Sequence, residues 1–186
     1  MSTQTQQLNS PTQITEAVDN LIAGILTDET KAHNTFRTTS VLTDGLVARN
    51  RTRGFEYVSD EPPVLGGNDL GPTPVELVLG ALCACQEIVV KAYASVLDIP
   101  VSKVTVDARG ELDLRGFLNV TEGVRSGFHT VSFDTVIETS ETNAGKLEQL
   151  KFFTENRCPV LDIIQNPVAI KGSVNFSTAT EASKAA

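Results

Sequence analysis

The chain has 186 residues, of which 40% are hydrophobic and 20% charged, and a formal net charge of -8. This length and composition indicate one globular domain that buries an ordinary core without disulfide or metal staples. The negative charge repels phosphate backbones and anionic lipid headgroups, so we expect no nucleic-acid partner and no membrane partner. The N-terminus, MSTQTQQLNS, has no signal-peptide pattern and no apolar run could span a bilayer, which favours a cytoplasmic protein.

The first predicted element is an amphipathic helix from Ser10 to Leu26. Ser10 supplies a hydroxyl cap, and apolar residues follow at helical spacing. Residues 34–58 change to β-branched and aromatic residues broken by Asp44-Gly45, which predicts two or three strands. Residues 60–72, DEPPVLGGNDLGP, predict an ordered loop without the spacing of a phosphate-binding loop. The polar ends, residues 1–9 and 178–186, are predicted tails.

A long apolar helix follows, from the capping pattern Thr73-Pro74-Val75-Glu76 to Leu97 or Asp98. It is the most apolar helix of the chain, so we expect it to be central. Polar and apolar residues alternate over residues 101–114, which predicts a strand with one wet face. A second β region is expected over 124–139, a helix over 143–156, a short helix from Cys158-Pro159 and a last strand over 168–177. The predicted fold class is therefore α+β, with β-sheets packed around the long helix.

Two of the three cysteines are candidates for chemistry. Cys85 shares its face of the long helix with apolar residues only, so it is either a small core residue or a thiol in an apolar pocket. Cys158 precedes Pro159 and so lies at the N-cap of a helix, where the free N–H groups favour a thiolate. An ordinary cap or buried residue is the alternative.

A metal site is not expected. Cys83 lies about 160° around the helix from Cys85, so the two thiols cannot bind one ion together. The only histidines, His33 and His129, are not at ligand spacing from a cysteine. Cys83 is assigned to packing, with some capacity for a non-productive disulfide.

The segment PTPVELVLGALCACQEIVV, followed downstream by NRCPV, resembles the OsmC/Ohr family of thiol peroxidases. In that family one cysteine lies in a long proline-led helix after two small residues, and its partner lies in a later Cys-Pro-Val. The resemblance extends loosely from Asn34 to Ser177. It implies a single OsmC-like domain over residues 1–186, with residues 1–32 as a helical N-terminal extension and 178–186 as a tail.

The resemblance also implies a reaction. Cys85 would attack an organic hydroperoxide and become a sulfenic acid, and Cys158 would resolve it as a disulfide. A small dithiol or a dithiol protein would reduce that disulfide, and neither a metal nor a bound organic cofactor is required. The fold would be an intertwined homodimer, which a helix apolar on most sides also favours.

The family lowers the thiol pKa with an arginine held by a glutamate. Arg53, before Gly54-Phe55-Glu56, resembles the arginine of the OsmC branch, while Arg37, Arg49 and Arg51 remain alternatives. The glutamate position of the hydroperoxide-resistance branch is Val75 here. Glu76 follows one residue later, and a role as the capping-box partner of Thr73 is the favoured interpretation of this residue. Glu56 and Glu61 are the other candidates.

Other functions remain open at this stage. The chain could be a non-enzymatic binding protein or a redox sensor that keeps an apolar ligand cavity, or it could have a purely structural role. The distinguishing features are a guanidinium at the Cys85 sulfur and a Cys158 within disulfide range.

Overall fold

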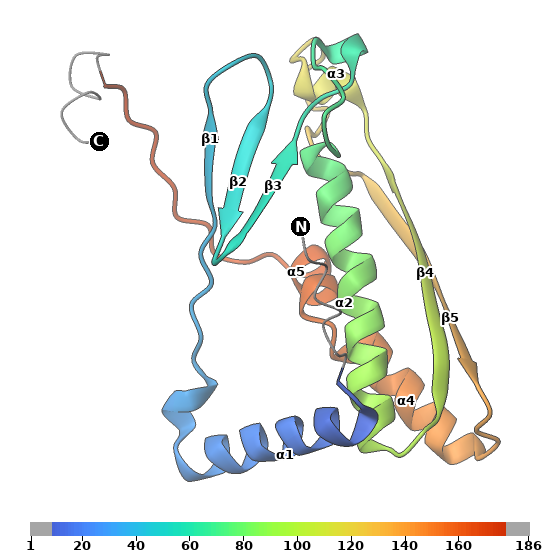
Figure 1. Ribbon diagram of the computed structural model, residues 1–186. Coiled ribbons are helices and arrows are strands. Elements are labelled where there is room, and N and C mark those ends of the chain that lie inside the picture. Colours follow the sequence, from blue (N-terminus) through green and yellow to red (C-terminus); the bar gives the residue numbers. More distant parts are fainter. Residues whose placement is uncertain (1–8, 178–186) are drawn as a thin grey trace, which may run out of the picture.

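Two small antiparallel sheets and a long helix dominate the computed structural model, which describes residues 9–177 (Figure 1). The predicted tails lie outside the described residues, except for Asn9. The predicted α+β class is confirmed. In chain order the elements are α1 (Pro11–Thr27), η1 (Glu29–Ala32), β1 (Thr39–Leu42), β2 (Ala48–Thr52), β3 (Phe55–Ser59), η2 (Pro63–Leu65), α2 (Pro74–Val96), β4 (Val101–Glu111), α3 (Leu114–Phe117), β5 (Thr130–Thr139), α4 (Ala144–Asn156) and α5 (Pro159–Gln165).

Helix α2 is the centre of the subunit, as its composition predicts. It begins with a full capping box between Thr73 and Glu76, which satisfies two backbone N–H groups. It ends shortly before Pro100. Proline has no backbone N–H to donate and so cannot continue the helix. Its buried face contributes to two clusters of core residues: Leu82 and Val89 with Cys158 and Leu161, and Val90 and Ala94 with Ile99 and Leu150.

Strands β4 and β5 form a long antiparallel pair that covers one side of α2 (Figure 1). The register runs from Val101 opposite Thr139 to Glu111 opposite Thr130. Alternate residues such as Ala108 and Phe133 pack toward α2, and the residues between them are exposed. The predicted alternation of wet and apolar faces over this strand is therefore confirmed.

The second sheet, with strand order β1-β2-β3, stands apart from α2 (Figure 1). Its first hairpin turns at Asp44-Gly45, and Gly45 has a φ of 57°, which favours glycine. Large apolar side chains on this sheet are exposed, among them Val41 at 61% and Phe55 at 64%. The sheet therefore has no packing partner within the described part of the chain.

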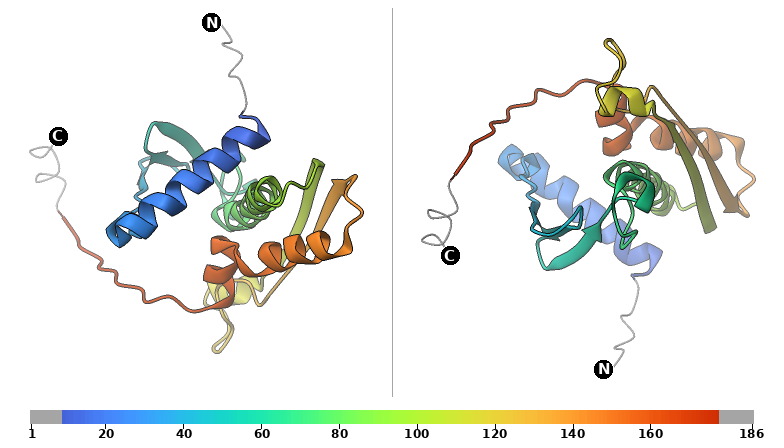
Figure 2. Two further views of the ribbon diagram at one scale, coloured as in Figure 1. Left: turned by 90° about the horizontal axis from the view of Figure 1, so that it is seen from below. Right: turned by 90° about the horizontal axis from the view of Figure 1, so that it is seen from above.

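Helix α1 lies across the C-terminal end of α2 and extends beyond it (Figures 1 and 2). The predicted capping box of Ser10 and Gln13 is present. Thr15 Oγ1 donates a hydrogen bond of 3.1 Å to the carbonyl oxygen of Ser95. No residue of α1 is buried, so its apolar stripe lacks a complete cover. Across residues 9–177, no helix is both long and apolar enough to cross a membrane.

Two predicted strand boundaries are wrong. The strand expected to reach Leu114 ends at Glu111, because Asp113 caps the short helix α3 by accepting the backbone N–H of Arg115. The β region expected from Val124 begins only at Thr130. Residues before it fold against α3, and Ser126 Oγ donates to the carbonyl oxygen of Gly116 at 3.3 Å. Local capping replaces strand pairing at both points.

The predicted last strand, residues 168–177, is also wrong for the single chain. The segment is extended but has no strand assignment, and all its residues are exposed. A strand needs a neighbour that accepts and donates its backbone hydrogen bonds. In the described residues nothing lies alongside this segment, which runs away from the core (Figure 1). Its β pattern therefore has no partner within one subunit.

Candidate functional site

The structure brings Cys85 and Cys158 together. Cys85 lies in the middle of α2, and Cys158 is the N-cap of α5, as predicted. Both belong to one apolar cluster that includes Leu82, Val89 and Leu161. The two sulfurs are close enough for the Cys158 thiol to influence the pKa of Cys85. All three cysteines of the chain, Cys83 included, are free thiols.

The two thiols differ in access to solvent. The Cys158 residue is only 3% exposed, whereas Cys85 is half-buried. A small molecule that approaches from solvent therefore reaches Cys85 first. This asymmetry suits an attacking thiol in front and a second thiol behind it.

The start of α5 presents backbone N–H groups to both sulfurs. The N–H of Leu161 donates to Cys158 Sγ at 3.4 Å, so the sulfur occupies the place of a capping oxygen. The N–H of Val160 lies near Cys85 and favours its thiolate. The short α5 thus begins at the point where the two thiols meet.

Within one subunit, Cys85 is held as a thiol. Burial has the largest effect and raises its pKa, the backbone N–H of Val160 lowers that pKa, and the neighbouring Cys158 raises it; together these effects leave the pKa above its ordinary value. No arginine among the described residues contributes to that pKa. A protonated thiol is a poor nucleophile, and no cation among the described residues lowers this pKa.

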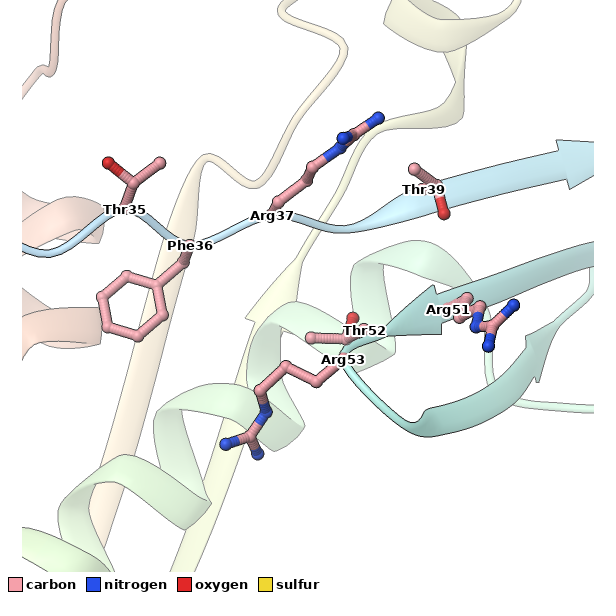
Figure 3. Close-up of a pocket in the computed structure, with 7 residues that line it drawn as sticks. All are labelled: Thr35, Phe36, Arg37, Thr39, Arg51, Thr52 and Arg53. Carbon is pink, nitrogen blue, oxygen red and sulfur yellow. The ribbon is translucent and has the colours of Figure 1, made fainter.

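Arg53, the predicted activating arginine, lies elsewhere in the subunit. It follows β2 in a left-handed conformation, with φ of 55°, and its guanidinium lies 5.2 Å from the ring centre of Phe55. It lines a cavity of about 820 Å³ together with Arg37, Arg51 and Phe36 (Figure 3). Across residues 9–177, neither these arginines nor Arg49 forms an ion pair.

Glu76, the predicted glutamate, is a capping residue in this structure. Its Oε2 accepts the backbone N–H of Thr73 at 2.7 Å and the Thr73 hydroxyl at 3.0 Å. The backbone N–H of Glu76 donates in return to Thr73 Oγ1. Glu56 lies opposite Arg51 in the sheet register, and Glu61 lies in the loop before η2. The subunit therefore places none of these carboxylates in an ion pair with an arginine among its described residues.

Sequence reasoning missed the role of Asp60, which directly follows β3 at the start of the loop before α2. Asp60 is 1% exposed, and its carboxylate accepts the backbone N–H groups of Glu61, Asn68 and Leu70. Burial alone would raise the pKa of this carboxyl, but the three N–H groups together lower it below its ordinary value. The carboxylate thus fixes the loop that leads into α2. An aspartate opening a Pro/Gly-rich loop was the available signal.

Sequence reasoning also missed that Gln86, next to Cys85, is fully buried. Its side of α2 turns toward β5 and α4. Among residues 9–177, no group of three or more histidine, cysteine or acidic side chains is arranged to hold a metal ion.

Comparison with known proteins identifies the family pattern. Residues 66–173, which include both Cys85 and Cys158, match the family described as OsmC-like protein. No curated protein matches the chain in sequence.

Several solved structures share the fold. An OsmC-like protein from Mycoplasma pneumoniae has 19% identity and a TM-score of 0.60, covering 72% of this chain and 89% of its own. An organic hydroperoxide resistance protein OsmC from Legionella pneumophila has 19% identity and a TM-score of 0.51, with coverage of 72% and 90%. An organic hydroperoxide resistance protein from Elizabethkingia anophelis has 18% identity and a TM-score of 0.52, and the match covers 73% of this chain and 91% of that protein. At these identities the likeness concerns the fold.

Proposed function

The chain belongs to the OsmC-like protein family, and on that premise we propose that it is a thiol-dependent peroxidase acting on organic hydroperoxides. The observation that carries this proposal is the contact between a solvent-reachable Cys85 and a buried Cys158 within one apolar cluster. The names of the Legionella and Elizabethkingia relatives, both organic hydroperoxide resistance proteins, point to the same chemistry.

The proposed reaction has three steps. The Cys85 thiolate attacks the outer oxygen of ROOH, the O–O bond breaks, and the alkoxide leaves as ROH after taking a proton. The resulting sulfenic acid is attacked by the Cys158 sulfur, which forms the disulfide and releases water. A dithiol, either a small molecule or a protein, then reduces the disulfide and becomes oxidised itself. The apolar residues around Cys85 favour an organic peroxide over hydrogen peroxide.

We propose that the functional unit is a homodimer, because a single chain leaves too much surface uncovered. A compact chain of this mass exposes about 8,700 Å², whereas this chain exposes 14655 Å². Even full exposure of the residues outside 9–177 would add only about 2,600 Å². The open face of α2, with Ile88 at 68% exposure, and the β1-β2-β3 sheet are the apolar surfaces to be covered.

The dimer would also supply the missing cation. The β1-β2-β3 sheet carries arginines that form no ion pair in the described residues, and Cys85 has no guanidinium beside it. We assign Arg53 of the second subunit to this role, because it extends from the hairpin end of a sheet that lacks a packing partner. Packing that sheet on the neighbour would then complete the site and lower the thiol pKa.

The proposal places the protein in the cytoplasm, where dithiol reductants keep cysteines reduced. One observation favours a second candidate, a non-enzymatic binding protein or redox sensor. The pKa of Cys85 is raised within the subunit, and a thiol that stays protonated would react slowly with peroxide.

The deciding experiment measures turnover of an organic hydroperoxide with a dithiol as reductant. Cys85→Ser should abolish turnover, and Cys158→Ser should allow one oxidation and leave a sulfenic acid on Cys85, detectable by mass spectrometry with a sulfenate trap. Cys83→Ser is the matched control on the same helix and should behave as the wild type. Equal, slow turnover by all four proteins would exclude the peroxidase and favour the binding protein.

A further inference from the structure

A second cavity lies between α2, β5 and α4, and none of the cysteines lines it. Its volume is about 560 Å³, within the range of small-molecule sites. Residues of α2, β5 and α4 line this cavity, and α4 runs beside α2 (Figure 2). Its walls are mainly apolar, from Phe133, Ile137, Leu147 and Leu150.

Two polar groups at this cavity have no hydrogen-bond partner in residues 9–177. Gln86 is 0% exposed, and neither its Nε2 nor its Oε1 is bonded. The Oγ1 of Thr135, on β5, is likewise buried and unpaired. Thr154 on α4 differs, because its hydroxyl donates to the carbonyl oxygen of Leu150 at 2.9 Å. Among the buried side chains of residues 9–177, the two that lack partners thus line the same cavity.

A buried primary amide without a hydrogen-bond partner lowers the stability of the folded protein. The neighbouring core positions of α2 hold Leu82 and Val90, and a leucine would fill the place of Gln86 with no unpaired group. The amide needs both a donor and an acceptor to be satisfied. Because these atoms have almost no accessible surface, a partner in the cavity reaches them only when the Gln86 side chain turns toward it.

We propose that this cavity binds a neutral amphipathic alcohol, with its alkyl chain against the apolar walls and its hydroxyl at Gln86 and Thr135. A hydroxyl both donates and accepts, which matches the amide oxygen and nitrogen together. The charged side chains that line the cavity, Asp134, Lys151 and Glu155, are exposed at its mouth. An ionised head group inside would lose its hydration without a counter-charge, so a neutral ligand fits better.

The site does not depend on the proposed peroxidase activity, and its test uses binding alone. The ¹⁵N-labelled full chain is titrated with 1-hexanol, and the side-chain NH₂ signal of Gln86 is followed by NMR. That signal is assigned by its loss in Gln86→Leu. A saturable shift of this signal is expected. Methyl pentyl ether, with the same atoms but no donor, should bind at least about tenfold more weakly, because the amide oxygen stays unpaired.

Variants separate the site from general effects. Gln86→Leu should abolish hexanol binding and raise the melting temperature, and Thr135→Val should weaken binding without unfolding the chain. Thr130→Val is the control, since it makes the same change on the same strand at an exposed position. The proposal is overturned if hexanol gives no saturable shift, if the ether binds equally well, or if Thr135→Val binds like Thr130→Val. Ordered water alone at Gln86, undisturbed by hexanol, overturns it as well.

Discussion

The Cys85 thiol on α2 lies beside the Cys158 thiol at the N-cap of α5, and Cys85 is the more exposed of the two. Both residues belong to the same packed cluster. Among the described residues, no positive charge contributes to the pKa of Cys85.

Replacing Arg53 by alanine should raise the pKa of Cys85 in the dimer, because a guanidinium from the second subunit would no longer stabilise the thiolate. The rate of Cys85 alkylation by iodoacetamide should then rise only at higher pH, and kcat/KM for an organic hydroperoxide should fall by about a hundredfold. Alkylation is measured against pH in a Cys83→Ser, Cys158→Ser background. Arg49→Ala, on the same sheet, is the matched control. Identical pH profiles for the two variants would remove Arg53 from the site.

Replacing Glu76 by alanine should lower stability and leave the chemistry intact. The change removes the carboxylate that accepts two hydrogen bonds from Thr73 at the start of α2. Loss of such a cap costs about 0.5–2 kcal/mol in the free energy of unfolding, measured by urea denaturation. A peroxidase rate reduced far beyond the loss of folded protein would instead identify Glu76 as the partner of the activating arginine. Glu148→Ala, on the exposed side of α4, controls for the loss of a surface charge.

Asp60→Asn should destabilise the protein at neutral pH but not in acid. The folded-state pKa of Asp60 is lowered, so the carboxylate contributes stability above its unfolded pKa, and this contribution is lost as the pH falls through the folded pKa. The melting temperatures of the wild type and the variant should therefore differ at neutral pH and converge at low pH. A constant difference down to strongly acid pH would show that the loop does not depend on the charge of Asp60.

Leu21→Asp should weaken the proposed dimer. Leu21 belongs to the apolar stripe of α1 and is 58% exposed in the single chain. We expect α1 to extend the dimer interface, so a charge there should raise the dimer dissociation constant at least about tenfold. Sedimentation velocity over a range of concentrations measures it. Asn20→Asp introduces the same charge at the next position on the exposed side of α1 and should leave the dimer unchanged. Equal constants for the two variants would place α1 outside the interface.

Much of the fold could be predicted from the sequence where local chemistry decides it. The capping boxes of α1 and α2 and the Cys158-Pro159 start of α5 depend on residues three or four positions apart, and all are present. The contact between Cys85 and Cys158 followed only from the family resemblance, because no local pattern relates residues so distant in sequence.

The remaining differences arise where distant or external groups decide the structure. Residues 168–177 have a strand pattern, but pairing needs a neighbour that the single chain does not offer. The burial of Gln86 depends on where α4 packs, and the pattern of apolar residues in α2 does not predict that position. Arg53 lies in the turn after β2, and no helical or strand period relates that turn to Cys85.

The sulfur of Cys158 serves as the cap of α5, so the choice of mutant decides what an experiment measures. An alanine at this position would remove a thiol and a helix start at once, and lost activity could then reflect a frayed first turn rather than missing chemistry. A serine keeps an acceptor for the Leu161 N–H. Cysteine-to-serine exchange therefore tests the thiol chemistry of this residue alone, whereas exchange to alanine also removes the helix cap.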